Sequence, residues 1–507
     1  MVLRTAVAIV AAAVVAFSIW QLESDKLGLS VSHGWVEDTP ITIHQRRDAD
    51  PAPVVVIAHG FAGSRRLMES FAIALAHNGY VALSLDFLGH GRHPLPLSGD
   101  LLREDGATLN LVAQIAQVTD YAETLAAGDG RVALLGHSMA ADIIIRHAQV
   151  APDVQATVAV SMFAPTITAD SPRNLLVVTG ALEPRLREEA IRVLRLSAGS
   201  EAAEGVTYGE PEDGTARRAA VAPGVEHVGV LYSRTSLQES VDWLDGVFGQ
   251  RDAGPVPARG PWVLALIGAF IVLCWALSAL LPRQTSIQEG AGLAWRKLLP
   301  IAVIPAIATP LILWPLPTGF LPVLVADYLA LHFLVYGVVT WLCLALWSQK
   351  PRDLSRRMLV AAGRSIPTAL LAGLLCLAVL FWIIDHYITA FSPIAYRVPI
   401  LLAMLAGTLL YFLTDEWATR GEGAARGGYP ATKVMFLLSL GVAVVLDLES
   451  LFFLIIIVPV MLSFFVVFGL FSRWINRRTG RPMAAGLVNA LAFAWALAVT
   501  FPLIDGG

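Results

Sequence analysis

The sequence predicts two domains of different class, an α/β domain with a mostly parallel sheet and an all-α domain of membrane-spanning helices. Three observations lead to this prediction. Strand and helix patterns alternate over residues 41–247, long apolar runs fill the chain from residue 262 onward, and a Pro/Gly-rich stretch separates the two parts. Alternating strands and helices are typical of a parallel sheet covered by helices on both faces.

The composition excludes an ordinary soluble enzyme. Of the 507 residues, 56% are hydrophobic and only 15% are charged, whereas about 25% are charged in a typical soluble domain. Mean hydropathy is +0.64. The net charge of -4 and the lack of a basic block argue against disorder and against nucleic-acid binding. All three cysteines lie in apolar runs, so the α/β domain contains no disulfide and no thiol nucleophile.

In the α/β domain, short apolar runs bounded by turn residues predict the strands, and longer amphipathic stretches between them predict helices. The predicted strands cover residues 41–45, 54–58, 81–86, 132–135, 157–161, 175–179 and 219–221. The clearest predicted helices cover residues 64–78, 111–127, 139–149 and 237–248. Parallel sheets of this kind carry their sites at the carboxyl ends of the strands.

Nine apolar runs approach the length of about 20 residues that crosses the hydrocarbon core. They cover residues 6–20, 262–281, 298–316, 321–347, 366–388, 398–413, 434–446, 451–471 and 484–504. The first is predicted as an N-terminal anchor within residues 1–22, with a cleavable signal peptide as the alternative. The other eight form a membrane domain over residues 262–507. The seventh run is short, which favours either a re-entrant segment or a bent hairpin with the eighth.

Positive charges in the loops predict the orientation of these spans. With the N-terminus inside, four inner loops carry fifteen basic residues, whereas the short outer loops carry only Arg397. The inner residues are Arg283, Arg296, Lys297, Lys350, Arg352, Arg356, Arg357, Arg364, Arg420, Arg426, Lys433, Arg473, Arg477, Arg478 and Arg481. We therefore expect a multi-pass protein of the cytoplasmic membrane. Its α/β domain, residues 31–250, faces the periplasm or extracellular space and is followed by a linker over residues 251–261.

One predicted strand-to-helix turn carries a candidate nucleophile. The strand over residues 132–135 runs into Gly136-His137-Ser138-Met139-Ala140, and a helix pattern follows. A Gly-x-Ser-x-Gly turn exposes its serine on a strained backbone and needs small neighbours; here Ala140 stands in place of the second glycine. The helix N-terminus behind Ser138 favours developing negative charge. Ser138 is therefore the predicted nucleophile.

Two other strand ends add to this pattern. His59-Gly60-Phe61 follows the strand over residues 54–58, where the backbone N–H of Phe61 can join that of Met139 in an oxyanion hole. Asp86-Phe87-Leu88-Gly89-His90-Gly91-Arg92 closes the next strand. With these three motifs the domain resembles the α/β-hydrolase superfamily, and in particular the small lidless serine esterases similar to dienelactone hydrolases. The resemblance covers about residues 31–249; the membrane domain resembles no family that we recognise.

The resemblance implies a catalytic triad in the order nucleophile, acid, histidine. Glu183, in the turn Gly180-Ala181-Leu182-Glu183 after a strand, matches the acid, and His227, in the loop before the last helix, matches the histidine. Asp170 is the alternative acid, and Asp213 a more distant one. His59, His90 and His137 are expected to shape the backbone. No cofactor and no metal is expected, since no metal-binding motif is present.

Ionisable residues also lie near the predicted outer ends of two spans. They are Asp327, His332, Asp385 and His386. Such residues usually face the interior of a helix bundle, so one interpretation is a polar groove that leads a lipid or amphiphilic ester to Ser138. The alternative is that they lie in the headgroup zone, where charge costs little.

The function predicted from these features is a membrane-bound serine hydrolase that cleaves a carboxylic ester, including a lipid or amphiphilic ester, through an acyl-enzyme. The expected partners are this substrate and the lipid bilayer, with no nucleic acid. An extracytoplasmic acyltransferase that uses the same triad is the first alternative. A transporter or sensor with a non-catalytic, ligand-binding hydrolase-like domain is the second. The sequence does not specify an oligomeric state.

Overall fold

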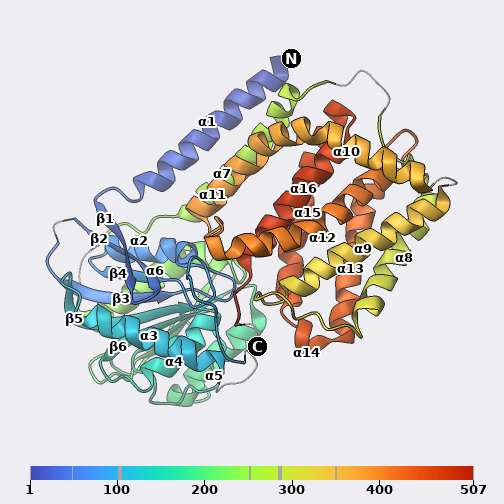
Figure 1. Ribbon diagram of the computed structural model, residues 1–507. Helices are drawn as coiled ribbons and strands as arrows, with labels where there is room; N and C mark the ends of the chain where they lie inside the picture. The colour runs from blue at the N-terminus through green and yellow to red at the C-terminus, as the bar shows by residue number, and fades with distance from the viewer. Residues whose placement is uncertain are drawn as a thin grey trace.

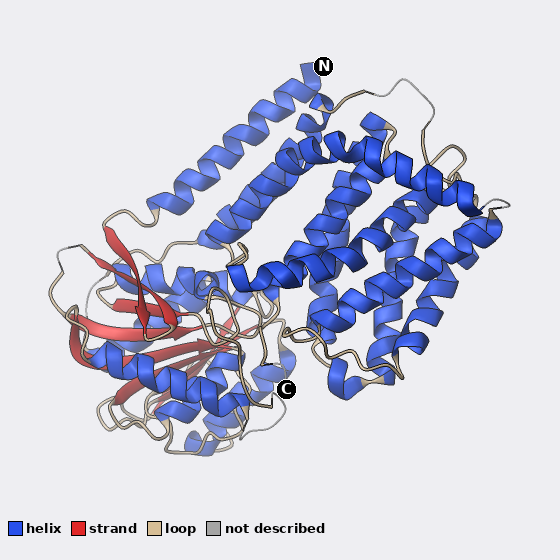
Figure 2. Cartoon of the chain, viewed as in Figure 1, coloured by secondary structure: helices blue, strands red, loops and turns tan. Residues whose placement is uncertain are grey.

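The computed structural model describes residues 2–47, 49–100, 106–250, 253–283, 288–348 and 351–505. Within them the chain forms an α/β domain and a helix bundle that lie side by side (Figure 1). All the strands gather in the first of these (Figure 2). Arg251 and Asp252 of the predicted linker, and Lys350 of a predicted inner loop, lie outside the described residues.

The α/β domain is built on one nine-stranded sheet in the order β1-β2-β4-β3-β5-β6-β7-β9-β8. The strands are β1 (Leu29–Val36), β2 (Thr39–Arg46), β3 (Ala52–Ala58), β4 (Val81–Leu85), β5 (Gly128–His137), β6 (Val154–Val160), β7 (Leu175–Gly180), β8 (Thr207–Tyr208) and β9 (Arg217–Ala222). The six strands from β4 to β9 along the sheet are parallel, and β1, β2 and β8 pair antiparallel at its edges. The mostly parallel sheet is as predicted, whereas β1 and β8 were not anticipated.

Helices cover both faces of this sheet. They are α2 (Glu69–His77), α3 (Ala107–Glu123), α4 (Met139–Ala148), α5 (Pro184–Ala198) and α6 (Arg234–Phe248). Alternate residues of β3 point to opposite faces, so that Val55 and Ile57 pack with α2 and α6, while Val54 and Val56 pack with α3 and α4. The predicted helix over residues 64–78 begins as a short 3₁₀ turn, η1 (Arg65–Met68), before α2.

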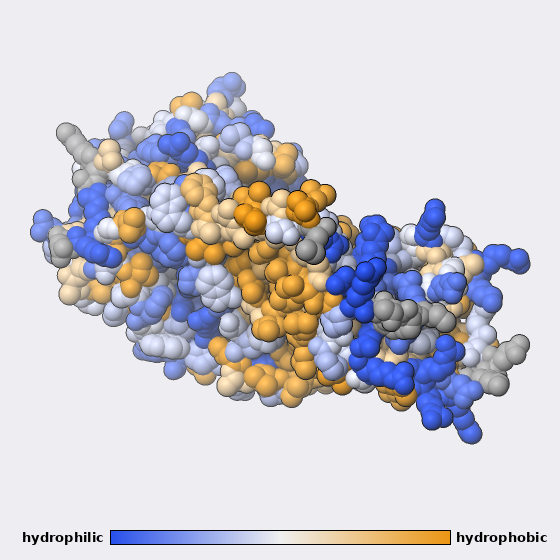
Figure 3. Space-filling view, turned by 90° about the horizontal axis from the view of Figure 1, so that it is seen from above, coloured by the Kyte–Doolittle hydropathy of each residue, from blue (hydrophilic) through white to orange (hydrophobic). Residues whose placement is uncertain are grey.

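The described residues contain nine helices that are long and apolar enough to cross a membrane, as expected of a multi-pass membrane protein. They are α1 (Val2–Ser24), α7 (Arg259–Leu277), α8 (Trp295–Leu313), α9 (Ala326–Trp347), α10 (Pro351–Gly373) continued through the π-helical segment η4 (Leu374–Ala378) into α11 (Val379–Tyr387), α12 (Val398–Thr419), α13 (Gly428–Leu446), α15 (Leu454–Thr479) and α16 (Pro482–Thr500). Apolar side chains form a band between two more hydrophilic ends (Figure 3).

The seventh span differs from its prediction. Helix α13 begins at Gly428, six residues earlier than its apolar run, and its 19 residues make a full span rather than a re-entrant segment. The extra length includes Lys433, which hydropathy alone places in a loop but which the bundle buries beside Asp415. A short helix, α14 (Leu448–Leu451), then joins α13 to α15.

The two domains are joined by direct backbone and side-chain contacts. Leu503, beyond α16, exchanges backbone hydrogen bonds with Gly89 (2.8 Å) and Leu97 (2.8 Å) of the α/β domain. The Arg397 guanidinium, 1% exposed, donates to the carbonyl oxygens of Gly89 in one domain and of Ala498 and Phe501 in the other. The loop after β4 is therefore held by the bundle as well as by its own sheet.

Candidate active site

The turn between β5 and α4 holds Ser138 in a strained conformation. Its backbone has φ 55° and ψ -118°, a conformation that residues other than glycine rarely adopt. A Cβ on Gly136 would lie 2.8 Å from the carbonyl oxygen of Ala140. The turn therefore requires glycine at position 136, and it raises the serine side chain at the carboxyl edge of the sheet.

Three side chains from separate strand ends meet at this edge. The Oγ of Ser138 is 2.9 Å from Nε2 of His227, and Nδ1 of the same imidazole is 2.5 Å from Oε1 of Glu183. Glu183 follows β7, and His227 lies in the loop between β9 and α6. The structure thus brings together the three residues that the sequence assigned to nucleophile, base and acid.

The Glu183 carboxylate is held from its second oxygen as well. Its Oε2 accepts hydrogen bonds from Ser161 Oγ and from the Gly180 backbone N–H, each at 2.7 Å. Burial would raise the pKa of Glu183, but the hydrogen bonds from His227, Ser161 and Gly180 outweigh burial and lower it. Glu183 is therefore an ionised acceptor that fixes the orientation of the imidazole.

Ser161 is a contributor that the sequence analysis missed. It follows β6 in a left-handed conformation, φ 52°, and its hydroxyl reaches Glu183 from the neighbouring strand end. The predicted strand over residues 157–161 ended at this serine, but no motif marks a residue whose role is to hold the acid.

Two backbone N–H groups near Ser138 have no hydrogen-bond partner among the described residues. They belong to Phe61 and Met139. The turn at Gly60 lies close to Ser138, since a Cβ on Gly60 would be 3.1 Å from the Ser138 Cβ. The imidazole of His59 supports this turn: Nδ1–H donates to Gly60 O at 2.8 Å, and Nε2 accepts from the N–H of Phe87 at 3.1 Å.

A second histidine supports the loop of the proposed base. The Nε2–H of His137 donates to the backbone carbonyl of His227 at 2.9 Å, and the two rings lie 4.8 Å apart. Burial lowers the pKa of His137 to about 3, so the ring is neutral near pH 7. In the described part of the chain, no group of three or more His, Cys, Asp or Glu side chains is placed to hold a metal ion.

The comparisons with known proteins agree with this architecture. Residues 49–202 match the family described as serine aminopeptidase, S33, and the parallel sheet places Ser138 at its carboxyl edge. The α/β domain has the α/β-hydrolase fold. The match supports a hydrolase. No curated protein sequence is similar enough to this chain to count as a relative.

Several solved structures are similar to the hydrolase fold of this chain. A dienelactone hydrolase from Anabaena variabilis is 18% identical over 43% of this chain and 96% of its own, with a TM-score of 0.32. A predicted CIB-like hydrolase from Thermoplasma acidophilum is 18% identical over 43% and 99%, with a TM-score of 0.33. A bacterial membrane phospholipase A is 15% identical over 47% and 92%, with a TM-score of 0.32.

The alternative acids of the hydrolase domain do not occupy the position beside His227. Asp170 is exposed and interacts electrostatically with the buried Arg217. Asp213 is also exposed. The structure therefore places Glu183, and not Asp170, against the imidazole.

The residues of the predicted polar groove are dispersed and engaged elsewhere. Asp385 accepts hydrogen bonds from the backbone N–H groups of Phe391 and Ser392 and pairs with Arg92 at 2.7 Å. The ring of His386 stacks on Trp382, with centroids 5.2 Å apart. Both residues therefore help to shape the outer end of α11.

Asp327 and His332 belong to α9 and also lie apart from the triad. Asp327 accepts from the N–H groups of Phe320 and Tyr328, which closes the loop before the helix. His332 is fully buried among aromatic rings, with Nδ1 3.3 Å from the Tyr328 hydroxyl. Among the described residues, none of the four groove candidates contacts Ser138, His227 or Glu183, and the groove stays a prediction.

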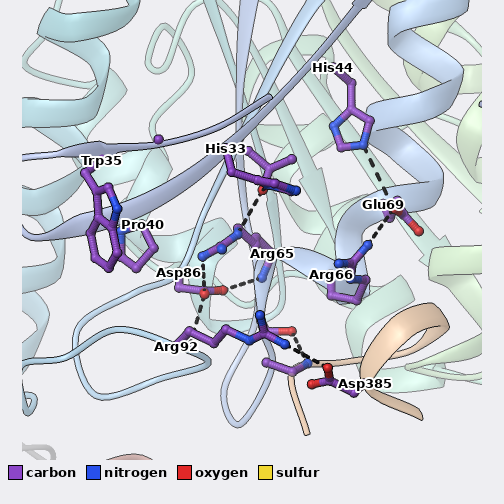
Figure 4. A pocket seen from close by; sticks show the side chains of 14 residues that line it. His33, Trp35, Pro40, His44, Arg65, Arg66, Glu69, Asp86, Arg92 and Asp385 are labelled. Carbon is purple, nitrogen blue, oxygen red and sulfur yellow. Dashed lines mark hydrogen bonds and ion pairs between the residues drawn. The ribbon is translucent and has the colours of Figure 1, made fainter. Parts of the chain in front are cut away.

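A cavity of about 320 Å³ lies where the hydrolase domain meets α11 (Figure 4). Each of its three arginines is held by a carboxylate: Arg65 by Asp86 at 2.5 Å, Arg66 by Glu69 at 2.9 Å and Arg92 by Asp385 at 2.7 Å. Ser138, Glu183 and His227 are not among its lining residues. We assign this cavity to the junction between the domains and not to the candidate active site.

Proposed function

We propose that this protein is a membrane-bound serine hydrolase that cleaves a carboxylic ester through an acyl-enzyme. The observation that carries the proposal is the continuous chain from Ser138 Oγ through His227 to Glu183, at 2.9 and 2.5 Å. The Ser138–His227 distance lies within the range in which a base takes a proton from a nucleophile, and the shorter His227–Glu183 contact lets the acid orient the base.

The proposed reaction uses each of these groups in turn. His227 Nε2 takes the Ser138 proton as Oγ attacks the ester carbonyl, and Glu183 stabilises the resulting imidazolium. The N–H groups of Phe61 and Met139 receive the developing oxyanion, where one donor typically contributes about 3–4 kcal/mol to transition-state stabilisation. The imidazolium then gives its proton to the departing alkoxide, which leaves as the alcohol. A water molecule that His227 deprotonates then attacks the acyl carbonyl. The imidazolium returns this proton to Ser138 Oγ as the carboxylic acid leaves, which restores the free enzyme.

The proposal also includes the place of the reaction. The basic residues of the loops favour an inner face opposite the hydrolase domain, and the apolar band of the bundle lies between two hydrophilic ends. We therefore place the active site on the outer face of the cytoplasmic membrane.

A cysteine-reactive, membrane-impermeant reagent should label a single cysteine introduced at exposed Glu226 in intact cells. Labelling that occurs only after lysis would reverse this orientation.

The direct test is covalent labelling of Ser138. The purified full-length protein, treated with a fluorophosphonate probe, should be labelled, and Ser138→Ala should lose both labelling and ester turnover, the latter by at least about a thousandfold. Ser197→Ala removes a hydroxyl on α5 that donates to the carbonyl oxygen of Leu194 and not to a triad residue; it is the matched control and should label like the wild type. Labelling that persists in Ser138→Ala, or a wild type that does not label, would reject the proposed function.

A further inference from the structure

The helix bundle reaches the candidate active site through one aromatic contact. Phe453, between α14 and α15, stacks on Phe61 of the hydrolase domain, with ring centroids 4.6 Å apart and planes inclined by 24°. Phe61 is the residue whose backbone N–H is proposed to bind the oxyanion. The residue that precedes a membrane-spanning helix therefore contacts the side chain of the residue proposed to bind the oxyanion.

Exposed apolar side chains surround the same edge of the hydrolase domain. Phe163 is 65% exposed and lies two residues after Ser161; Leu182 is 63% exposed and precedes Glu183; Val228 is 49% exposed and follows His227. Large apolar side chains exposed together around a site commonly mark the surface that receives an apolar ligand.

The neighbouring turn of the bundle exposes apolar side chains next to the polar Glu449 and Ser450. Leu448 of α14 is 56% exposed, and Phe452, next to Phe453, is 48% exposed. The rings of Phe452 and Phe453 meet edge to face at 5.9 Å. An apolar surface on the bundle is thus continuous, through Phe453, with the Phe61 turn.

These contacts indicate what kind of group the site accepts beside the carbonyl. The charged groups that line the cavity at the junction are paired with one another, as described above, whereas the Phe61–Phe453 contact is made by two apolar rings. A hydrocarbon chain gains from such a surface, since each methylene moved out of water contributes up to about fourfold to kcat/KM. A small polar ester gains nothing comparable from it.

We propose that Phe453 and Phe61 together form the wall that receives the hydrocarbon chain, so that the substrate is a long-chain carboxylic ester. This inference rests on the proposed function and deepens it. The bundle then supplies part of the substrate site, and Phe453 is a specificity-determining residue contributed by a membrane-spanning helix.

The test is the dependence of turnover on chain length. For the full-length protein in detergent micelles, kcat/KM should rise by at least tenfold from p-nitrophenyl acetate to p-nitrophenyl laurate. Phe453→Ala should lose at least tenfold on laurate, with a loss on acetate several-fold smaller, and Phe453→Leu should recover part of the laurate activity. Phe320→Ala, an exposed aromatic of the loop between α8 and α9, is the matched control and should keep the wild-type profile.

Three outcomes separate this inference from the proposed function. A wild type that prefers acetate, or a Phe453→Ala variant that loses equally on both esters, would overturn the hydrocarbon wall, because Phe453 would then only support the Phe61 turn. Ser138 labelling together with acetate turnover would show that the hydrolase proposal stands in those cases. Without Ser138 labelling, the proposed function itself fails. The wild-type profile decides the question even if Phe453→Ala does not fold.

Discussion

Two buried carboxylates, one in each domain, are paired in different ways. Glu183 of the hydrolase domain holds His227, whose side chain is 43% exposed. Asp415 of the bundle holds Lys433, and the two side chains are only 3% and 5% exposed. The first pair continues to the half-buried Ser138, the proposed nucleophile, whereas both members of the second pair are buried in the bundle.

The pair in the bundle belongs to a larger balanced network. Glu416, adjacent to Asp415, pairs with Arg420 at 3.0 Å and accepts a hydrogen bond from Ser472. Both cations also lie over the ring of Tyr429, Lys433 at 4.1 Å and Arg420 at 4.2 Å. Two acids thus face two bases, as is required where a single unpaired charge would be costly.

The difference shows that a carboxylate paired with a basic side chain can belong to a candidate active site in one domain and stabilise the helix packing in the other. In the hydrolase domain the backbone of Ser138 is strained, and the N–H groups of Phe61 and Met139 have no partner among the described residues. The His227 side chain is also partly exposed, so these groups are available to a ligand. In the bundle the charged groups of the network already have partners. The comparison therefore predicts that substitutions in the first network remove activity and that substitutions in the second remove stability.

The largest effect is expected for Glu183→Gln. The amide keeps the shape of the side chain but cannot stabilise the imidazolium or hold the same tautomer of His227, so kcat should fall by about 10³–10⁴-fold. The pKa of Glu183 is lowered, so the wild-type carboxylate is ionised throughout the usual assay range. Steady-state ester hydrolysis measures the loss, and thermal unfolding should show that the fold persists.

Asp170→Asn is the matched control for this prediction. Because Asp170 is exposed and faces Arg217 rather than His227, its replacement should leave kcat within about twofold. A large loss in Asp170→Asn together with an active Glu183→Gln would assign the acid to Asp170 and contradict the geometry.

The next effect concerns the closed network. Lys433→Met leaves Asp415 buried without its cation and should destabilise the bundle by about 3–5 kcal/mol, because breaking one partner of a buried pair strands the other charge. Unfolding in detergent, followed by tryptophan fluorescence, measures this change.

The double variant Asp415→Asn with Lys433→Met sharpens the comparison. Removing both charges should recover most of the lost stability, and the molecules that remain folded should label at Ser138 like the wild type. If Lys433→Met unfolds like the wild type yet loses ester turnover, the network takes part in catalysis and the division between the two domains fails.

The last prediction is a pH dependence of the stability of the hydrolase domain. Burial lowers the pKa of His44 and His59 to about 4 and that of His90 and His137 to about 3. In the unfolded chain these groups titrate near 6.5. The unfolded state therefore binds more protons as pH falls below about 6.5, and each histidine removes up to about 1.4 kcal/mol of stability per pH unit.

This dependence can be measured through Ser138. Protein heated at pH 7.5, 6.5 or 5.5, cooled and returned to pH 7.5 should lose probe labelling at progressively lower temperatures. An inactivation temperature that stays constant from pH 7.5 to 5.5 would show that these histidines are not the neutral, buried groups described here.

Much of this architecture could be predicted from local sequence patterns. The parallel sheet follows from alternating strand and helix periods, and the turn at Ser138 follows from small residues at fixed spacing. The network around Lys433 could not be predicted, because its partner Asp415 lies 18 residues away on another helix and hydropathy assigns both to a loop. Strand β1 could not be predicted from burial periodicity, because only its end residues Leu29 and Val36 are buried and pairing with β2 holds it at the sheet edge.

The candidate site was predicted in its parts but not in its surroundings. Ser138, Glu183 and His227 lie in turns that family motifs describe. Phe453 carries no such mark, since one phenylalanine in an apolar run looks like any other lipid-facing residue. The surroundings of Asp385 could not be predicted for a related reason: its carboxylate accepts backbone N–H groups at a helix end, and sequence spacing does not distinguish that use from a path for substrate.

The backbone pairing of Leu503 with Gly89 and Leu97 bears on the order in which the protein is made. Synthesis proceeds from the N-terminus, and domains generally begin to fold as they emerge. The hydrolase domain is thus produced first, yet its loop after β4 meets its partner only once the last membrane helix is in place. We therefore expect the loop after β4 to reach its final conformation only after α16 has been inserted.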